Sequence, residues 1–188
     1  MPRLLTNVVG FDDGPFVRER RGVPVLLVGA VCARTRLDGV VSGRVRKDGA
    51  DATARIAELV RGSQFDGHIR AVLLGGIAVG GFNVVDIHAL AAELARPVLV
   101  VARRLPRLAL IRDALDKLPR GAGKWRLIEQ AGAMEPVGNV FVQRAGLTIA
   151  EASALLAATT LHGNMPEPLR LAHLIAGGIA TGKSRGRA

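Results

Sequence analysis

Three strand-like runs follow one another within the first 46 residues of the chain, with Gly and Asp in the turns between them. The runs cover residues 7–11, 23–33 and 39–46. Closely spaced strands can pair in antiparallel fashion, whereas parallel neighbours need a crossover of about a dozen residues or more. The beginning of the chain therefore predicts an antiparallel meander.

Strand and helix patterns alternate after the meander. Helices are predicted at residues 51–61, 84–95, 107–118, 148–160 and 166–180. Strands are predicted at residues 71–74, 97–102, 125–129 and 140–144. Thr148 and Glu151 form a capping box at one helix start. The order predicts an α/β fold with a mixed sheet, in which the meander joins parallel strands and helices cover both faces.

Length and apolar content favour one compact domain over residues 1–188. The chain has 188 residues and 49% hydrophobic content, enough to bury a core. The uncharged run at residues 71–85 is too short and too rich in Gly to cross a bilayer, and residues 1–5 lack the features of a secretory signal. We therefore expect a cytoplasmic protein with no membrane partner. Cys32, the only cysteine, is expected to be a small core residue.

The charge of the chain points to a polyanionic partner. Lys and Arg number 26 against 16 Asp and Glu, a formal net charge of +10. Nucleic acid is the natural partner, and a solvated basic surface is the alternative. Because the chain has no Tyr and one Trp, contacts should be mostly to phosphates and depend strongly on salt. The basic tail at residues 183–188 carries Lys183, Arg185 and Arg187, which can contact a phosphate backbone.

The last predicted helix brings a cation and a titratable group to one face. Asn164 is expected to cap it, and Pro166 and Pro168 suit its first turn. The residues spaced as a buried stripe are Leu171, Leu174, Ile175 and Ile179. Arg170 and His173 lie on another face and project together. The alternative is a surface arginine and a hydrogen-bonded histidine.

Acidic residues follow two of the predicted strands. Asp12 and Asp13 come directly after the first strand, next to a Gly turn. Hard cations prefer carboxylate oxygens, and metal-assisted phosphodiester cleavage needs a polarised phosphate and an activated water. Both residues can equally be turn formers. Asp48 and Asp51 follow the third strand, where each is a candidate ligand, turn residue or helix cap.

Two arginines follow a buried strand later in the chain. Arg103 and Arg104 come directly after the strand at 97–102. Ligands of α/β sheets gather beyond strand ends, and a guanidinium there can hold a phosphate. Both residues are therefore candidate nucleic-acid contacts.

Residues 177–184 match the pattern G-x-x-x-x-G-K-[ST] of phosphate-binding loops. Such a loop follows a strand and leads into a helix, whereas here the segment follows a predicted helix and only four residues come after it. The motif therefore gives little support to a nucleotide-binding enzyme.

The order of these features resembles the endonuclease V family, including Pro-Glu-Pro-Leu-Arg-Leu-Ala-His at residues 166–173. Four segments resemble its archaeal branch, known as endonuclease dU. They are Gly-Phe-Asp-Asp-Gly-Pro-Phe at 10–16, Asp-Gly-Ala-Asp-Ala-Thr at 48–53, Gly-Gly-Phe-Asn-Val-Val-Asp at 80–86 and Ser-Arg-Gly-Arg-Ala at 184–188. The resemblance covers essentially the whole chain. It implies a ribonuclease H-like fold and cleavage of nucleic acid near deaminated bases with a divalent metal.

Carried over by position, the resemblance implies roles for individual residues. Asp12 would be the metal ligand of the first strand, for Mg2+ or Mn2+. Arg103 would stand where the family has a phosphate-contacting lysine, and His173 would line the active site. Either Asp48 or Asp51 would supply the acid after the third strand, and Asp51 is favoured.

Two departures from the family leave the activity open. Gly75 stands where the family has a metal-binding aspartate, and the strand-separating Pro-Tyr-Ile-Pro segment is missing. The first hypothesis is a metal-dependent endonuclease that acts on DNA or RNA, with a role in repair of deaminated bases. The alternative is a nucleic-acid-binding protein whose catalytic site is degenerate.

Overall fold

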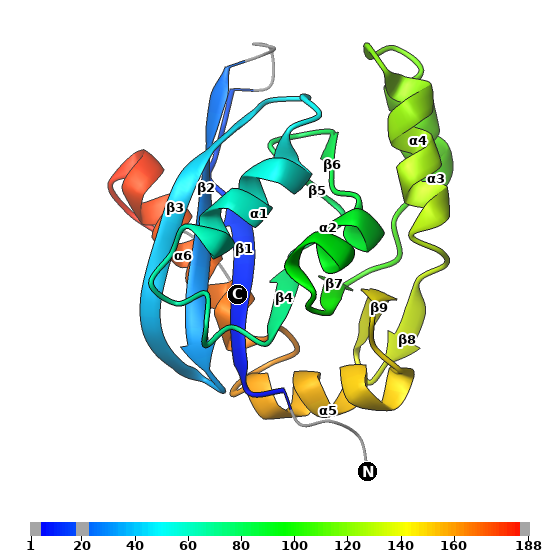
Figure 1. Ribbon diagram of the computed structural model, residues 1–188. Coiled ribbons are helices and arrows are strands. Elements are labelled where there is room, and N and C mark those ends of the chain that lie inside the picture. Colours follow the sequence, from blue (N-terminus) through cyan, green and yellow to red (C-terminus); the bar gives the residue numbers. More distant parts are fainter. Residues whose placement is uncertain (1–4, 18–22, 185–188) are drawn as a thin grey trace.

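A mixed sheet forms the centre of the protein (Figure 1). The structure, a computed structural model, describes residues 5–17 and 23–184. Across the sheet the strand order is β3-β2-β1-β4-β7-β9-β8. These strands are β1 (Asn7–Asp13), β2 (Pro24–Ala33), β3 (Arg36–Arg46), β4 (Ala71–Leu74), β7 (Val98–Ala102), β8 (Glu135–Val137) and β9 (Val140–Ala145). A separate small sheet pairs β5 (Ala78–Val79) with β6 (Asn83–Val84).

The pairing confirms the predicted combination of meander and parallel strands. β1, β2 and β3 pair in antiparallel order, and β1 then pairs in parallel with β4, and β4 with β7. β9 returns antiparallel to β7. β3 begins at Arg36, three residues earlier than the predicted start, because a tight turn with Arg34 at φ 57° leads directly into it.

Helices cover both faces of the sheet, as predicted. The helices are α1 (Ala52–Arg61), α2 (Ile87–Leu94), α3 (Leu108–Leu115), α4 (Gly121–Gln130), α5 (Ile149–Thr159) and α6 (Glu167–Thr181). Alternate residues of β1 divide between two cores. Val9 packs in the cluster that contains residues of α1 and α2, whereas Val8 packs with residues of α5 and α6. No helix among the described residues is long and apolar enough to cross a membrane.

Residues 125–129 were predicted as a strand, and this is wrong. They lie in α4, where Lys124 and Ile128 are buried one helical turn apart. Trp125 Nε1 donates to Glu129 Oε1 at 2.6 Å, a contact between residues i and i+4 that an extended strand cannot make. α3 and α4 form a helical hairpin beside the sheet (Figure 1).

Two details predicted for the last helix are also wrong. Pro166 occupies the position before α6, and Asn164 instead accepts a hydrogen bond from Asn139 at 3.2 Å. The buried residues of α6 include Leu169, Ala172 and Ala176, whereas the predicted stripe is half-buried or, at Ile179, 62% exposed. Small residues face the sheet because α6 packs very closely against β1 and β2.

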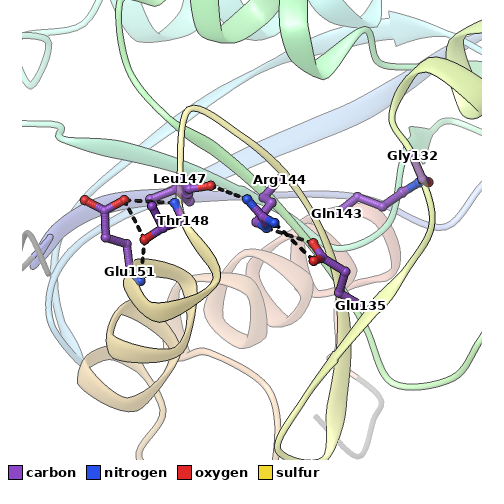
Figure 2. A network of polar contacts seen from close by, with 7 residues as sticks. All are labelled: Gly132, Glu135, Gln143, Arg144, Leu147, Thr148 and Glu151. Atoms are coloured by element: carbon purple, nitrogen blue, oxygen red, sulfur yellow. Dashed lines mark hydrogen bonds and ion pairs between the residues drawn. The ribbon is translucent and has the colours of Figure 1, made fainter.

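Polar contacts fix β8, β9 and the start of α5 (Figure 2). Arg144 of β9 binds the Glu135 carboxylate through Nε at 2.7 Å and donates from Nη1 to the Leu147 carbonyl oxygen at 2.6 Å. Thr148 and Glu151 form the predicted capping box at the start of α5. The edge of the sheet and the adjacent helix are therefore tied together.

Candidate active site

The end of β1 and the middle of α6 bring a carboxylate and an imidazole into contact. Nδ1 of His173 lies 2.9 Å from Oδ2 of Asp12. The other carboxylate oxygen of Asp12 accepts the backbone N–H of Asp13, also at 2.9 Å. The Asp12 side chain is 22% exposed and that of His173 49%. A partly sheltered acid is therefore paired with a histidine that solvent can reach.

Two hollows meet at this pair of residues. The first hollow, of about 360 Å³, is lined by Asp12 and His173 together with Gly75, Arg103 and Arg170. The second hollow, of about 600 Å³, shares Asp12 and His173 and also contacts Asp13, Phe16 and Lys183. Arg103, Arg170 and Lys183, which were predicted from sequence, therefore lie beside the pair. An extended anionic ligand could pass across Asp12 with cations on either side.

Burial and hydrogen bonding act in opposite directions on the two acids of β1. Burial raises the pKa of Asp12 above its usual 3.8, although the Asp13 N–H and His173 act to lower it. Burial raises the pKa of Asp13 to about 6, with the Asp12 charge as the next cause. The Asp13 carboxylate accepts the N–H of Gly80 at 3.0 Å. The raised pKa values indicate that the surrounding protein does not fully stabilise two negative charges at this site.

A buried acid holds Arg170, one of the two arginines that line the first hollow. Glu167 is 3% exposed and accepts from Nε of Arg170 at 2.9 Å and from Nη2 at 2.6 Å. Among the described residues Nη1 of Arg170 has no hydrogen-bond partner, so it can contact a ligand. The sequence reasoning missed this role of Glu167, although the i, i+3 spacing of an acid and an arginine in a helix was a signal for it.

The acids after β3 lie elsewhere. Asp51 Oδ1 accepts from the Arg46 N–H at 3.2 Å and from Asn83 Nδ2 at 2.6 Å, so it stabilises the turn before α1. Asp48 accepts from the Phe82 N–H and from Lys47. Neither acid lines the two hollows. Within the described parts of the chain, no group of three or more His, Cys, Asp or Glu side chains is placed to hold a metal ion.

The remaining predicted contacts are only partly described. Arg104 is exposed beyond β7. Arg185 and Arg187 lie outside the described residues. The segment that resembles a phosphate-binding loop is helical from Gly177 to Thr181, which agrees with its exclusion from sequence.

Comparison with known sequences identifies the family. The family model for endonuclease dU matches residues 5–180. The chain belongs to the endonuclease dU family. A UPF0215 protein of Deinococcus radiodurans is 57% identical over 187 residues, which cover 99% of this chain and 94% of that protein. A UPF0215 protein of Methanosarcina barkeri is 40% identical over 97% of this chain and 94% of its own length. Relatives of the endonuclease dU family therefore occur in bacteria as well as in archaea. The prediction that the family is an archaeal branch is too narrow.

Comparison with solved structures shows that the fold of this endonuclease dU chain is similar to that of endonuclease V. A crystal structure of a protein of unknown function from Archaeoglobus fulgidus has a TM-score of 0.87 at 36% identity, covering 93% of this chain and 98% of that one. Endonuclease V from Bacillus subtilis has a TM-score of 0.61 at 14% identity, covering 94% and 81%. These similarities confirm the predicted ribonuclease H-like fold.

Gly75 occupies the position at which the resemblance to endonuclease V predicts a metal-binding aspartate. A Cβ atom at Gly75 would lie 3.7 Å from Asp12 Oδ1, an ordinary contact distance. A carboxylate at this position would therefore face Asp12. Its absence leaves the first hollow open beside the Asp12–His173 pair.

Proposed function

We propose that this protein binds nucleic acid across the two hollows and cleaves a phosphodiester bond beside Asp12 with the help of a divalent metal. The observation that carries the proposal is the Asp12–His173 contact of 2.9 Å in a hollow that also contains Arg103 and Arg170. An acid, a histidine and two guanidinium groups suit a phosphodiester substrate.

The residues present fit a hydrated Mg2+ or Mn2+. Mg2+ commonly keeps several waters and uses one or two carboxylates from the protein together with substrate phosphates. Asp12 supplies such a carboxylate, and the open space at Gly75 can hold water instead of a further ligand. When bound, the metal would polarise a phosphate oxygen and lower the pKa of a water molecule. Asp51 is left out of the proposed ligand set because its Oδ1 already accepts two hydrogen bonds in another cavity.

The protein's own residues have separable roles in this proposal. Asp12 holds the cation and orients the His173 ring through Nδ1. His173 has a second ring nitrogen, Nε2, with which it can exchange a proton with the substrate or water. Arg103 and Arg170 bind the phosphates, and Glu167 positions Arg170.

A specific observation favours a second candidate, binding without cleavage. Gly75 removes one expected carboxylate, and neither Asp48 nor Asp51 replaces it in the first hollow. A site with one acid and one histidine would hold metal weakly. In that case the net charge of +10 and the cations around the hollows would still bind nucleic acid.

The substrate class is proposed from the relatives. An endonuclease V from Ciona intestinalis, with a TM-score of 0.58 at 13% identity, was crystallised with a 24mer DNA that contains an inosine. The substrate set should therefore include DNA and RNA oligonucleotides with inosine, with uracil and without any modified base. Preference for one of them would identify the base that is recognised.

The decisive experiment compares Asp12→Asn with Asp51→Asn. Oligonucleotide binding and Mn2+-dependent cleavage would be measured for both variants and for the unmodified protein. Asp12→Asn should lose cleavage and keep binding within about twofold, because it disables metal activation and leaves the basic surface intact. Asp51→Asn should keep both. Equal cleavage by Asp12→Asn and the unmodified protein would end the assignment of Asp12, and no cleavage by any of them would favour binding alone.

A further inference from the structure

A cationic cavity lies between the loop that follows β3 and the start of α4. This α4 cavity has a volume of about 310 Å³ and is lined by residues that include Arg46, Asp48, Asp51, Arg120 and Lys124. It shares no lining residue with either hollow at Asp12. A ligand in it would therefore contact other residues than those around the Asp12–His173 pair.

Lys124 is the least expected residue of the α4 cavity. It is only 4% exposed, although lysine is almost never fully buried unless its charge is paired. Its Nζ donates to the backbone carbonyl of Asp48 at 2.5 Å. An ammonium group has three N–H donors, and within the described part of the chain Lys124 has no ion pair and no second acceptor. Two N–H donors of Lys124 are therefore left for a ligand.

The carboxylates of the α4 cavity compensate the Lys124 charge only in part. Both oxygens of Asp48 are engaged, one by Lys47 at 2.9 Å and the other by the Phe82 N–H at 2.9 Å. Asp51 uses Oδ1 for the turn before α1. Burial lowers the pKa of Lys124, and although the Asp48 charge opposes this, the Arg120 charge lowers the pKa further. An anion in the cavity would relieve both effects.

The backbone on each side of the α4 cavity is strained. Asp48 has φ 52° and Arg120 has φ 60°, both in the left-handed region that residues other than glycine seldom adopt. Such backbone conformations cluster at ligand sites. The buried lysine contacts this part of the backbone, since Lys124 Nζ donates to the Asp48 carbonyl oxygen, and both Arg46 and Arg120 line the same cavity.

We propose that the α4 cavity is a binding site for a phosphate group, held by Lys124, Arg46 and Arg120, which all line it. Lysine binds phosphate as a point charge, and arginine offers paired N–H donors. The volume is near the lower end of the range for small-molecule pockets, enough for a phosphate with a small substituent. The phosphate can belong to a nucleic-acid backbone or to a free phosphate compound, since the chemistry of recognition is the same.

The test uses inorganic phosphate as the probe, at constant ionic strength maintained with chloride. Trp125, the only tryptophan, is the residue next to Lys124, so its fluorescence should report binding, with calorimetry as a second measurement. The unmodified protein should bind phosphate saturably. Arg120→Gln and Lys124→Met should each weaken binding about tenfold, as expected for the loss of a charge-assisted hydrogen bond.

Arg126→Gln is the matched control, because Arg126 is an exposed arginine of the same helix that does not line the cavity. It should bind phosphate like the unmodified protein. If Lys124→Met does not fold, Arg46→Gln replaces it, since Arg46 is exposed. No saturable phosphate signal, or an equal loss of affinity in Arg126→Gln, would overturn the proposal.

A competing oligonucleotide distinguishes the two sources of phosphate. Displacement of phosphate by a short single strand would identify the site as a backbone contact. Simultaneous binding of phosphate and oligonucleotide would identify it as a site for a free phosphate compound. Both results support a phosphate site. Because the measurement does not involve cleavage, it can succeed or fail independently of the function proposed for Asp12.

Discussion

Gly10 of β1 lies directly against Pro168 of α6: a Cβ atom at Gly10 would come within 2.5 Å of the Pro168 carbonyl carbon and 2.7 Å of the Leu169 nitrogen. Both are backbone atoms, so the helix cannot yield by rotating a side chain. This close approach places α6 on β1 and sets His173 beside Asp12, which lies two residues beyond Gly10. The lack of a side chain at Gly10 therefore allows the close packing that brings His173 to Asp12.

The first prediction concerns this contact. Gly10→Ala should lower the free energy of unfolding by about 2 kcal/mol or more, because overpacking against a backbone forces the helix to move. Gly178→Ala is the control. It lies in α6, and a Cβ atom there would meet nothing within 4 Å, so it should stabilise the protein by about 0.5–1 kcal/mol. Urea unfolding measures both, and equal effects would contradict the packing argument.

The second prediction concerns Gly75. Gly75→Asp should fold, because the nearest atoms to a new Cβ are at 3.7 Å or more, and it should raise Mn2+ affinity by placing a second carboxylate opposite Asp12. Calorimetric titration with Mn2+ measures the affinity. Unchanged Mn2+ affinity in a folded variant would show that the side chain does not face Asp12.

Cleavage assays of the same variant separate the two candidate functions. If the native site is degenerate, the unmodified protein should cut nothing detectable and Gly75→Asp should gain Mn2+-dependent cleavage. If the native site is active with its present ligands, Gly75→Asp should leave cleavage unchanged or reduce it, because an added charge disturbs the existing arrangement. Folded proteins that both remain inert would count against the nuclease proposal.

The third prediction concerns the salt dependence of nucleic-acid binding. The logarithm of the binding constant should fall linearly with the logarithm of salt concentration, with a slope of about −0.7 for each phosphate contacted on a single strand. Arg170→Gln should make the slope less steep by about that amount. Arg61→Gln is the control, because Arg61 pairs with Glu93 away from both hollows and its loss should leave the slope unchanged. Affinity that does not vary with salt would remove both candidate functions.

The fourth prediction concerns Asp48 and pH. Burial acts to raise the pKa of Asp48, but the Phe82 N–H and Lys47 outweigh it and hold the pKa below the usual 3.8. Because the folded-state pKa is lowered, the carboxylate stabilises the protein above pH 3.8, and this contribution is lost as the pH falls through the folded-state pKa. Asp48→Asn should therefore destabilise the protein at pH 7 by roughly 1–3 kcal/mol, with a smaller difference below pH 3.8.

Asparagine suits this test because it tolerates the left-handed backbone at Asp48. The control is Asp116→Asn, since the Asp116 side chain is 62% exposed and lies 3.8 Å from Arg112. Its effect should be below about 0.5 kcal/mol. Unfolding measured from pH 3 to pH 7 gives both results. A loss of stability in Asp48→Asn that is the same at every pH would show that the carboxylate charge is not the cause.

Much of the fold was determined by local patterns in the sequence. Apolar runs such as those of β2 and β4 specify buried strands, and Thr148 with Glu151 specifies a helix start, because these signals act between residues that are close in the chain. The prediction of a strand at residues 125–129 was wrong because it also relied on a local pattern alone. A short mixed run has no clear period, and its helical state depends on the burial of Lys124 and Ile128 against other elements.

The sequence by itself also singled out Asp12, Arg103, Arg170 and His173, through their places at strand ends and on one helix. Only the tertiary structure decided which of these groups meet. The Asp12–His173 contact joins residues 161 positions apart, and it depends on the close packing of α6 against Gly10. In the same way Asp51 resembles a ligand in sequence, but its neighbour Asn83 makes it part of a turn. Charge and residue type are properties of the chain, whereas distance between side chains is set by packing.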